Sequence, residues 1–175
     1  MPINVSMSAP QPQMVSIDSV RLHDGRSLCL RSWAGPGDPV VMLHGLLDSS
    51  EGWTDVAERL PCARIAVDLP GFGYSDAPLR GSIGGYARDV AEALELLGVQ
   101  RYTLIGHSLG GAVAAALAEL SPEQVGALLL VAPAGFGRIR LAEASRCPAC
   151  ARSCRPRCPP RCRADWPSAP RTWRW

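Results

Sequence analysis

The sequence predicts an α/β fold with a mostly parallel sheet and helices on both of its faces, and three observations support this. Short apolar runs alternate with amphipathic stretches along residues 40–132, as strands alternate with helices in such folds. An Asp24-Gly25 pair joins two earlier strand-like runs as a hairpin. The residues with chemical character follow the apolar runs, at the strand ends where parallel sheets bind ligands.

The strands are predicted from apolar runs and from turn signals. Residues 15–22 and 27–33 flank the hairpin turn, so we expect an antiparallel pair at an edge of the sheet. The run 40–45 begins with four successive apolar residues that leave no solvated face, which is typical of a buried strand. Further strands are expected over 64–69, 101–106 and 125–132.

Three helices are predicted between these strands. Trp53, Val56, Ala57 and Leu60 fall at helical spacing, with Ser49 or Ser50 as the N-cap. A longer apolar stripe over residues 83–97 stops at Gly98, a glycine of the type that ends helices. A third helix is expected over 109–120.

Composition divides the chain into three parts: a disordered leader (1–14), one folded domain (15–143) and a disordered tail (144–175). Met1–Ser145 holds ten Arg against fifteen acidic residues, whereas Arg146–Trp175 holds eight Arg against one Asp. Five of the seven cysteines also lie in the tail, which has neither strand nor helix periodicity. The amino-acid sequence of this tail resembles the translation of GC-rich DNA in a shifted reading frame.

The body of the chain predicts a soluble cytoplasmic protein. Only Cys29 and Cys62 lie before residue 144, which gives no disulfide framework and indicates a reducing compartment. The first residues lack the basic and apolar regions of a signal peptide, and no run reaches the length of a membrane span. We therefore expect no membrane partner.

The segment Gly106-His107-Ser108-Leu109-Gly110 fits the pattern G-x-S-x-G, directly after an apolar strand and directly before a helix. A sharp strand-to-helix turn crowds the positions two before and two after the serine, so a Cβ there would clash. The turn also lifts the hydroxyl of Ser108 above the sheet at a helix N-terminus, where free N–H groups favour negative charge. Ser108 is the candidate nucleophile.

Two backbone amides are candidates for holding an oxyanion. One is the N–H of Leu109, directly after the serine. The second is the N–H of Leu46, because Gly45 permits a tight backbone in the loop after the earlier strand. The site is thus predicted to combine Ser108 with Leu109 and Leu46.

Four neighbouring features are assigned supporting roles. We interpret His44 as a structural residue of the donor loop, and His107 as a residue that shapes a pocket or packs, since its side chain should point away from Ser108. Gly45, Gly106 and Gly110 permit the tight backbone. The segment 68–76, "DLPGFGYSD", lacks the lysine of a phosphate-binding loop and is interpreted as a shaped loop over the site.

Four segments in this order, "VVMLHGLLDSSEGW", "RIAVDLPGFGYSD", "YTLIGHSLGGAVAAALA" and "ALLLVAPAGFG", resemble the α/β-hydrolase fold superfamily, in its esterase, lipase and carbon–carbon hydrolase branch. The resemblance covers about residues 15–140. It implies a cofactor-free hydrolase with a small-molecule substrate, in which a serine attacks a carbonyl and water releases the acyl group. In this superfamily the strand-to-helix turn at G-x-S-x-G is called the nucleophile elbow, and a serine at the elbow argues against the dehalogenase and epoxide hydrolase branches.

The resemblance also implies a triad acid and histidine after two further strands. No histidine follows His107, and the downstream acids Glu143 and Asp165 have no strand context. His23 lies on the hairpin turn and is a poor substitute. We therefore expect a fold truncated before its last strands, with very low or no activity of this chain.

A second hypothesis makes the body a non-catalytic scaffold whose tail binds zinc or an acidic partner. Cys147-x-x-Cys150 and the cysteines that follow match a zinc site in number, but no histidine or apolar core accompanies them. We favour the unstructured tail over a zinc module, and the arginines alone indicate only a generic polycation, not a nucleic-acid partner. The oligomeric state is left open.

Overall fold

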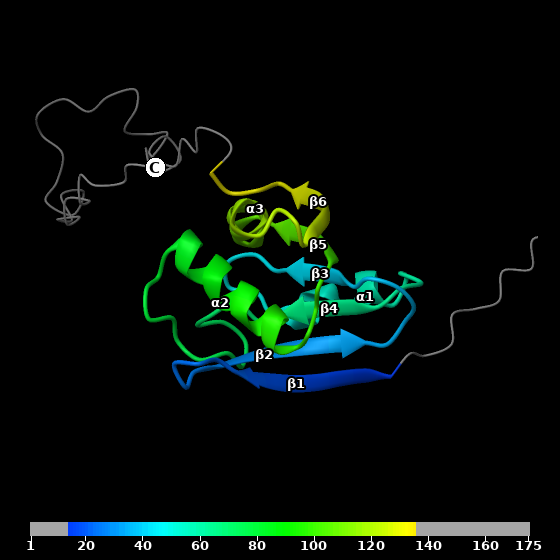
Figure 1. Ribbon diagram of the computed structural model, residues 1–175, viewed down its shortest axis with the longest axis horizontal. Coiled ribbons are helices and arrows are strands. Elements are labelled where there is room, and N and C mark those ends of the chain that lie inside the picture. The colour runs from blue at the N-terminus through cyan, green and yellow to red at the C-terminus, as the bar shows by residue number, and fades with distance from the viewer. Residues whose placement is uncertain (1–13, 136–175) are drawn as a thin grey trace, which may run out of the picture. The chain divides into compact units, whose positions relative to one another are not determined.

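The computed structural model describes residues 14–135, which form a six-stranded mixed sheet in the order β1-β2-β4-β3-β5-β6 (Figure 1). The strands are β1 (Val15–Arg21), β2 (Ser27–Trp33), β3 (Val40–Leu43), β4 (Arg64–Val67), β5 (Tyr102–His107) and β6 (Val125–Val131). β1 pairs with β2, and β2 with β4, in antiparallel register, while β4, β3, β5 and β6 are parallel. The predicted mostly parallel sheet with an antiparallel edge pair is confirmed.

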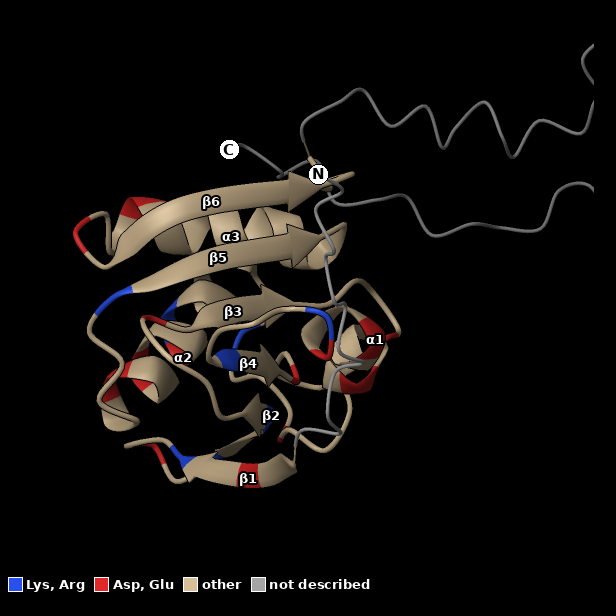
Figure 2. Ribbon diagram, turned by 90° about the vertical axis from the view of Figure 1, so that its right-hand side faces the viewer, with Lys and Arg blue, Asp and Glu red and all other residues tan. Residues whose placement is uncertain are grey.

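Helices lie on both faces of the sheet, as predicted (Figure 2). On one face, α2 (Ile83–Leu96) and α3 (Leu109–Leu120) cover the larger core, which includes Leu28, Val41, Leu43, Leu104, Val90, Leu94, Val113 and Leu117. On the other face, η1 (Ser50–Trp53) and α1 (Thr54–Ala57) cover a smaller cluster of Trp33, Met42, Ala57 and Ala66. Burial on both faces explains why β3 and β4 are continuous apolar runs.

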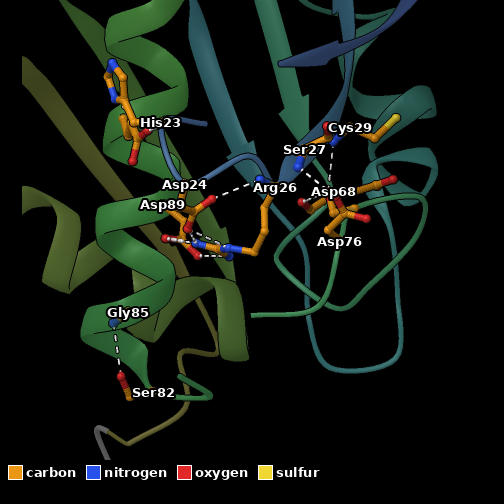
Figure 3. Close-up of polar contacts among 12 residues, drawn as sticks. His23, Asp24, Arg26, Ser27, Cys29, Asp68, Asp76, Ser82, Gly85 and Asp89 are labelled. Carbon is orange, nitrogen blue, oxygen red and sulfur yellow. Dashed lines mark hydrogen bonds and ion pairs between the residues drawn. The ribbon is translucent and has the colours of Figure 1, made fainter. Parts of the chain in front are cut away.

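The first hairpin is tied to the larger helical layer by a bidentate ion pair. Gly25 has φ of +89°, which the turn requires, and Leu22 and Arg26 close the turn by a backbone hydrogen bond. The guanidinium of Arg26 then reaches both carboxylate oxygens of Asp89 on α2, at 2.7 and 2.9 Å (Figure 3). This contact orders the edge of the sheet against α2.

The first helical segment is shorter than the helix that the apolar stripe from Trp53 to Leu60 predicts. Ser49 caps it, accepting the N–H of Glu51, as expected, but regular helix ends at Ala57. The amides of Arg59 and Leu60 bond only three residues back, as in a 3₁₀ turn. Leu60 precedes Pro61, and a residue before proline disfavours the helical region, so the helix cannot continue.

The remaining helix limits follow their sequence signals. Ser82 caps α2 by accepting the N–H of Gly85 at 3.1 Å, and α2 ends before Gly98, which has φ of +72°. α3 starts directly after Ser108.

No helix within residues 14–135 is long and apolar enough to cross a bilayer. The leader up to residue 13 and the tail 144–175 lie outside the described residues, so the structure does not test those predictions.

Candidate active site

Three strand ends meet at the carboxyl edge of the sheet, because β4, β3 and β5 are parallel neighbours. His44 and Gly45 follow β3, the loop 68–76 follows β4, and Ser108 follows β5. This topology brings together the segments that sequence analysis singled out. Figure 2 shows the three strands side by side, with α1 beside their carboxyl ends.

Ser108 occupies the strand-to-helix turn in a backbone conformation that side-chain-bearing residues rarely adopt. Its φ is +51° and its ψ is −113°. Its N–H donates to the carbonyl of Val131 at 3.0 Å, and its carbonyl accepts from Gly111 and Ala134 at 3.0 and 2.8 Å. The turn is thus held by β6 and the segment after it as well as by α3. Strain of this kind persists only where surrounding structure over-determines the backbone, and it is frequent at functional sites.

The glycines on either side of Ser108 are needed for close backbone approach. A Cβ on Gly106 would collide with the carbonyl of Gly110, and a Cβ on Gly110 would collide with the carbonyls of Leu43 and His44. The crowding predicted from the sequence is confirmed by these contacts. Gly45 is similarly close, because a Cβ there would lie 3.0 Å from Nδ1 of His107 and 3.4 Å from the Cβ of Ser108.

The hydroxyl and the two amides assigned to the site are not used elsewhere. Within residues 14–135, the Ser108 hydroxyl makes no hydrogen bond and does not cap its own helix. In the same region, no hydrogen bond uses the N–H of Leu46 or the N–H of Leu109. These donors and this hydroxyl are therefore available to a ligand.

The ring of His44 is held by hydrogen bonds at both of its nitrogens. The ring is fully buried, its Nε2 accepts the N–H of Leu69 at 2.9 Å, and its Nδ1–H donates to the carbonyl of Gly45 at 2.7 Å. The amide of Leu69 can only donate, so this network assigns the proton to Nδ1. The rings of His44 and Phe72 also pack nearly perpendicular to each other, with centroids 5.6 Å apart. With both nitrogens occupied, His44 cannot take a proton from Ser108 without losing a bond.

The other two histidines form no hydrogen bond with Ser108 either. Strand alternation places His107 with Ile105 on the α1 face of β5, where it lines a surface cavity of about 400 Å³ with Trp53 and Leu129. His23 pairs with Glu92 on α2, at 2.8 Å, on the hairpin turn. The chain has three histidines, all of them described, and none hydrogen-bonds Ser108.

The contribution of Asp68 was not predicted from the sequence, where this residue appears only as the first residue of the loop 68–76. This carboxylate is 1 % exposed and accepts backbone N–H groups from two different loops. The sequence signal was present: an aspartate directly after a buried strand, followed within five residues by Gly71 and Gly73. Its meaning depends on which loop lies opposite, and sequence spacing alone does not specify that.

Burial lowers the pKa of His44, and the bond to Gly45 and the carboxylates of Asp68 and Asp48 oppose this more weakly. A histidine kept neutral in the folded state binds its proton more readily when unfolded, so stability is full above the unfolded pKa near 6.5 and falls as the pH drops below it. We expect the free energy of unfolding in urea to fall between about pH 7.5 and pH 5.5, by at most about 1.4 kcal/mol per pH unit.

A His23→Gln variant is the control, because the side chain of His23 is 79 % exposed. The variant removes the contact with Glu92 but keeps His44, so its free energy of unfolding should still fall between the two pH values. A flat profile of the wild-type chain, or a fall abolished by His23→Gln, would show that His44 does not control this dependence.

The sheet order, with an antiparallel pair before parallel strands, and the glycine-flanked turn between β5 and α3 are features of the α/β-hydrolase fold. The family model of the alpha/beta hydrolase fold matches residues 38–157, and the chain belongs to this family. The matched residues extend past residue 143, the predicted end of the domain. Cys147 and Cys150, on which the zinc hypothesis rests, lie outside the described residues.

Individual proteins and solved structures are also similar to this chain. The chain is 39% identical over 105 residues to the uncharacterized protein Rv2715 of Mycobacterium tuberculosis. The aligned region covers 58% of this chain and 31% of that protein. It is 36% identical over 112 residues to the 2-hydroxy-6-oxononadienedioate/2-hydroxy-6-oxononatrienedioate hydrolase of Comamonas testosteroni, covering 59% and 39%. The crystal structure of a membrane phospholipase A, a bacterial virulence factor, matches with a TM-score of 0.66 and 32% identity, covering 72% and 42%. The chain thus spans roughly a third of the length of these curated relatives.

Proposed function

We propose that this chain carries the nucleophile half of a serine hydrolase, with Ser108 as nucleophile and the amides of Leu109 and Leu46 as oxyanion donors. The observation that carries the proposal is the backbone of Ser108, held at φ +51° between Gly106 and Gly110 with its hydroxyl unused in the described region. A strained turn that presents a free hydroxyl beside free amides is the arrangement that acyl transfer requires.

The reaction is a two-step hydrolysis of an ester-like or other carbonyl substrate. Oγ of Ser108 attacks the carbonyl carbon, and the oxygen becomes an oxyanion held by the two amides. The leaving group departs with a proton to give an acyl-enzyme, and water then attacks the same carbon and releases the acid. The 2-hydroxy-6-oxo acid in the name of the Comamonas relative supports a small carbonyl compound as substrate.

The proposal includes very low turnover for this chain. An unassisted serine hydroxyl is a weak nucleophile near neutral pH and needs an adjacent general base. His44 is committed to Leu69 and Gly45, and His107 and His23 contact other parts of the fold. We infer that the base and acid come from outside residues 14–135.

A fluorophosphonate probe tests the assignment, because it labels a reactive serine without completing a catalytic cycle. Oγ of Ser108 forms a bond to phosphorus, fluoride leaves, and the hydroxyl proton passes to water. We expect a single slow adduct on the wild-type chain, located on Ser108 by peptide mass spectrometry, and none on Ser108→Ala. Loss of one nucleophile removes essentially all of this reaction.

Ser121→Ala is the matched control, since Ser121 is the C-cap at the opposite end of α3. It should label at the wild-type rate. Equal labelling of Ser108→Ala and the wild type would refute the assignment of Ser108 as nucleophile.

A further inference from the structure

We propose that Asp68 is a positioning residue for this site, whose carboxylate ties the donor loop (residues 44–50) to the loop that follows β4 (residues 68–76) and thereby places the amide of Leu46. This inference rests on the proposed role of Leu46 as an oxyanion donor. Asp68 itself touches neither Ser108 nor the amide of Leu46 in any hydrogen bond of the described region.

The carboxylate of Asp68 connects the two loops directly. Oδ1 accepts the N–H of Ser50, at the end of the donor loop, at 2.6 Å. Oδ2 accepts the N–H of Tyr74, in the second loop, at 2.9 Å. No ion pair of the described residues involves this buried carboxylate, whose hydrogen bonds come from the two backbone amides and from the side chain of Cys29. Both amides would lose their acceptor together if the carboxylate were removed.

The backbone of Asp68 is fixed to the sheet, so the carboxylate has a defined position. Its N–H donates to the carbonyl of Cys29 on β2 at 2.9 Å. Its carbonyl accepts the hydroxyl of Ser75 at 2.7 Å, and the same hydroxyl oxygen accepts the N–H of Cys29 at 2.8 Å. Figure 3 shows Asp68 beside Cys29, with Asp76 and Ser27 adjacent. Asp68 is therefore the fixed end of the tie, and the donor loop is the segment that it holds.

The donor loop is anchored at both of its ends to consecutive residues. His44, at its start, accepts the N–H of Leu69, and Ser50, at its end, donates to Asp68. Between these anchors, Leu46 and Leu47 are 64 % and 89 % exposed, so packing contributes little to their position. Inside the loop, the N–H of Asp48 donates to the carbonyl of Gly45 at 3.4 Å and closes a turn around Leu46. The two anchors hold this turn against the sheet, and Asp68 provides one of them.

The second loop is built around this carboxylate. Gly73 has φ of +53°, and a Cβ at that position would collide with the carboxylate of Asp68. A glycine is thus required both by the backbone conformation and by the space that the carboxylate fills. The loop after β4 and the side chain of Asp68 form a single matched unit.

Asp68→Asn tests the inference with little change in volume. An amide can accept one N–H through its oxygen, but its NH₂ group then faces the second N–H, so one loop loses its acceptor and the other keeps only a weaker, uncharged one. We expect the maximal rate of fluorophosphonate labelling at saturating probe to fall about tenfold or more, while the probe concentration for half-maximal rate changes less than about twofold. Hydrogen exchange should rise at residues 45–50 and stay unchanged in β5 and α3.

Asp76→Asn is the matched control, because Asp76 lies in the same loop and its Oδ2 accepts the N–H of Ser27, which belongs to β2 and not to the donor loop. It should label at the wild-type rate with unchanged exchange at residues 45–50. An equal loss of labelling in both variants, or exchange raised throughout the chain by Asp68→Asn, would reduce Asp68 to a general role in stability and overturn the inference.

The two proposals fail in different ways. If Asp68→Asn loosens residues 45–50 but labels at the wild-type maximal rate, the tie does not position the donor and the inference is wrong, while Ser108 remains the nucleophile. If the wild-type chain is not labelled on Ser108, the proposed function is wrong. Hydrogen exchange alone then tests whether Asp68 holds the donor loop. Unchanged exchange at residues 45–50 then overturns it, and a rise confined to that loop supports it.

Discussion

Gly110→Ala is expected to lose roughly 3 kcal/mol or more of unfolding free energy, which is enough to unfold a chain of ordinary marginal stability. The added Cβ would meet the carbonyl oxygens of Leu43 and His44, far inside 3.0 Å. Those carbonyls belong to the end of a central strand, so neither side of the contact can yield without breaking the sheet. Urea unfolding followed by circular dichroism measures the loss.

Gly84→Ala provides the matched comparison. Gly84 lies exposed in α2, and a Cβ there would meet no atom within 4 Å. Alanine is the better helix former, so this variant should gain up to about 1 kcal/mol. If Gly110→Ala were as stable as Gly84→Ala, the close approach of α3 to β3 would be wrong.

Ser108→Gly is expected to be more stable than Ser108→Ala by about 1–2 kcal/mol, although neither variant can be labelled. Alanine keeps the strain of φ +51° and ψ −113°, which costs of order 1–3 kcal/mol for a residue with a Cβ. Glycine adopts this conformation freely, and only part of the gain is offset by the greater entropy of its unfolded chain. Urea unfolding of the two variants gives the difference directly.

The same pair of substitutions at Ser121 should give the opposite order. Ser121 has φ of −135°, which alanine adopts without strain, so Ser121→Ala should be the more stable variant. A glycine variant at 108 less stable than the alanine variant would mean that the turn is not strained. The expected result would instead mean that the candidate nucleophile is kept at a cost in stability.

The sequence predicted most of the elements because their signals are local. The turn at Asp24-Gly25, the cap at Ser82 and the stop at Gly98 each depend on a few neighbouring residues, and each appears in the structure. The elbow was predictable for the same reason, since strand, G-x-S-x-G and helix are contiguous. The early end of α1 also had a local signal in Pro61, which the apolar stripe concealed.

The parts that sequence reasoning did not reach depend on which strands are neighbours. The bond from Leu69 to His44 joins residues 25 apart, and the bond from Ser50 to Asp68 joins residues 18 apart. Both exist only because β3 and β4 lie side by side, with β2 beyond them. Helical or strand periodicity does not indicate which distant residues will form hydrogen bonds with each other. The role of Asp68 can therefore be seen only in the assembled sheet.

Because hydrogen bonds from β6 and the segment after it hold Ser108, the elbow depends on residues outside β5 and α3. The N–H of Ser108 reaches Val131, and its carbonyl is reached by Ala134, both encoded more than twenty residues downstream. On a ribosome, the turn at Ser108 cannot take its final shape until those residues have emerged. A peptide containing only β5 and α3 would likewise relax to an ordinary backbone, so the motif is transplantable only together with its neighbouring strand.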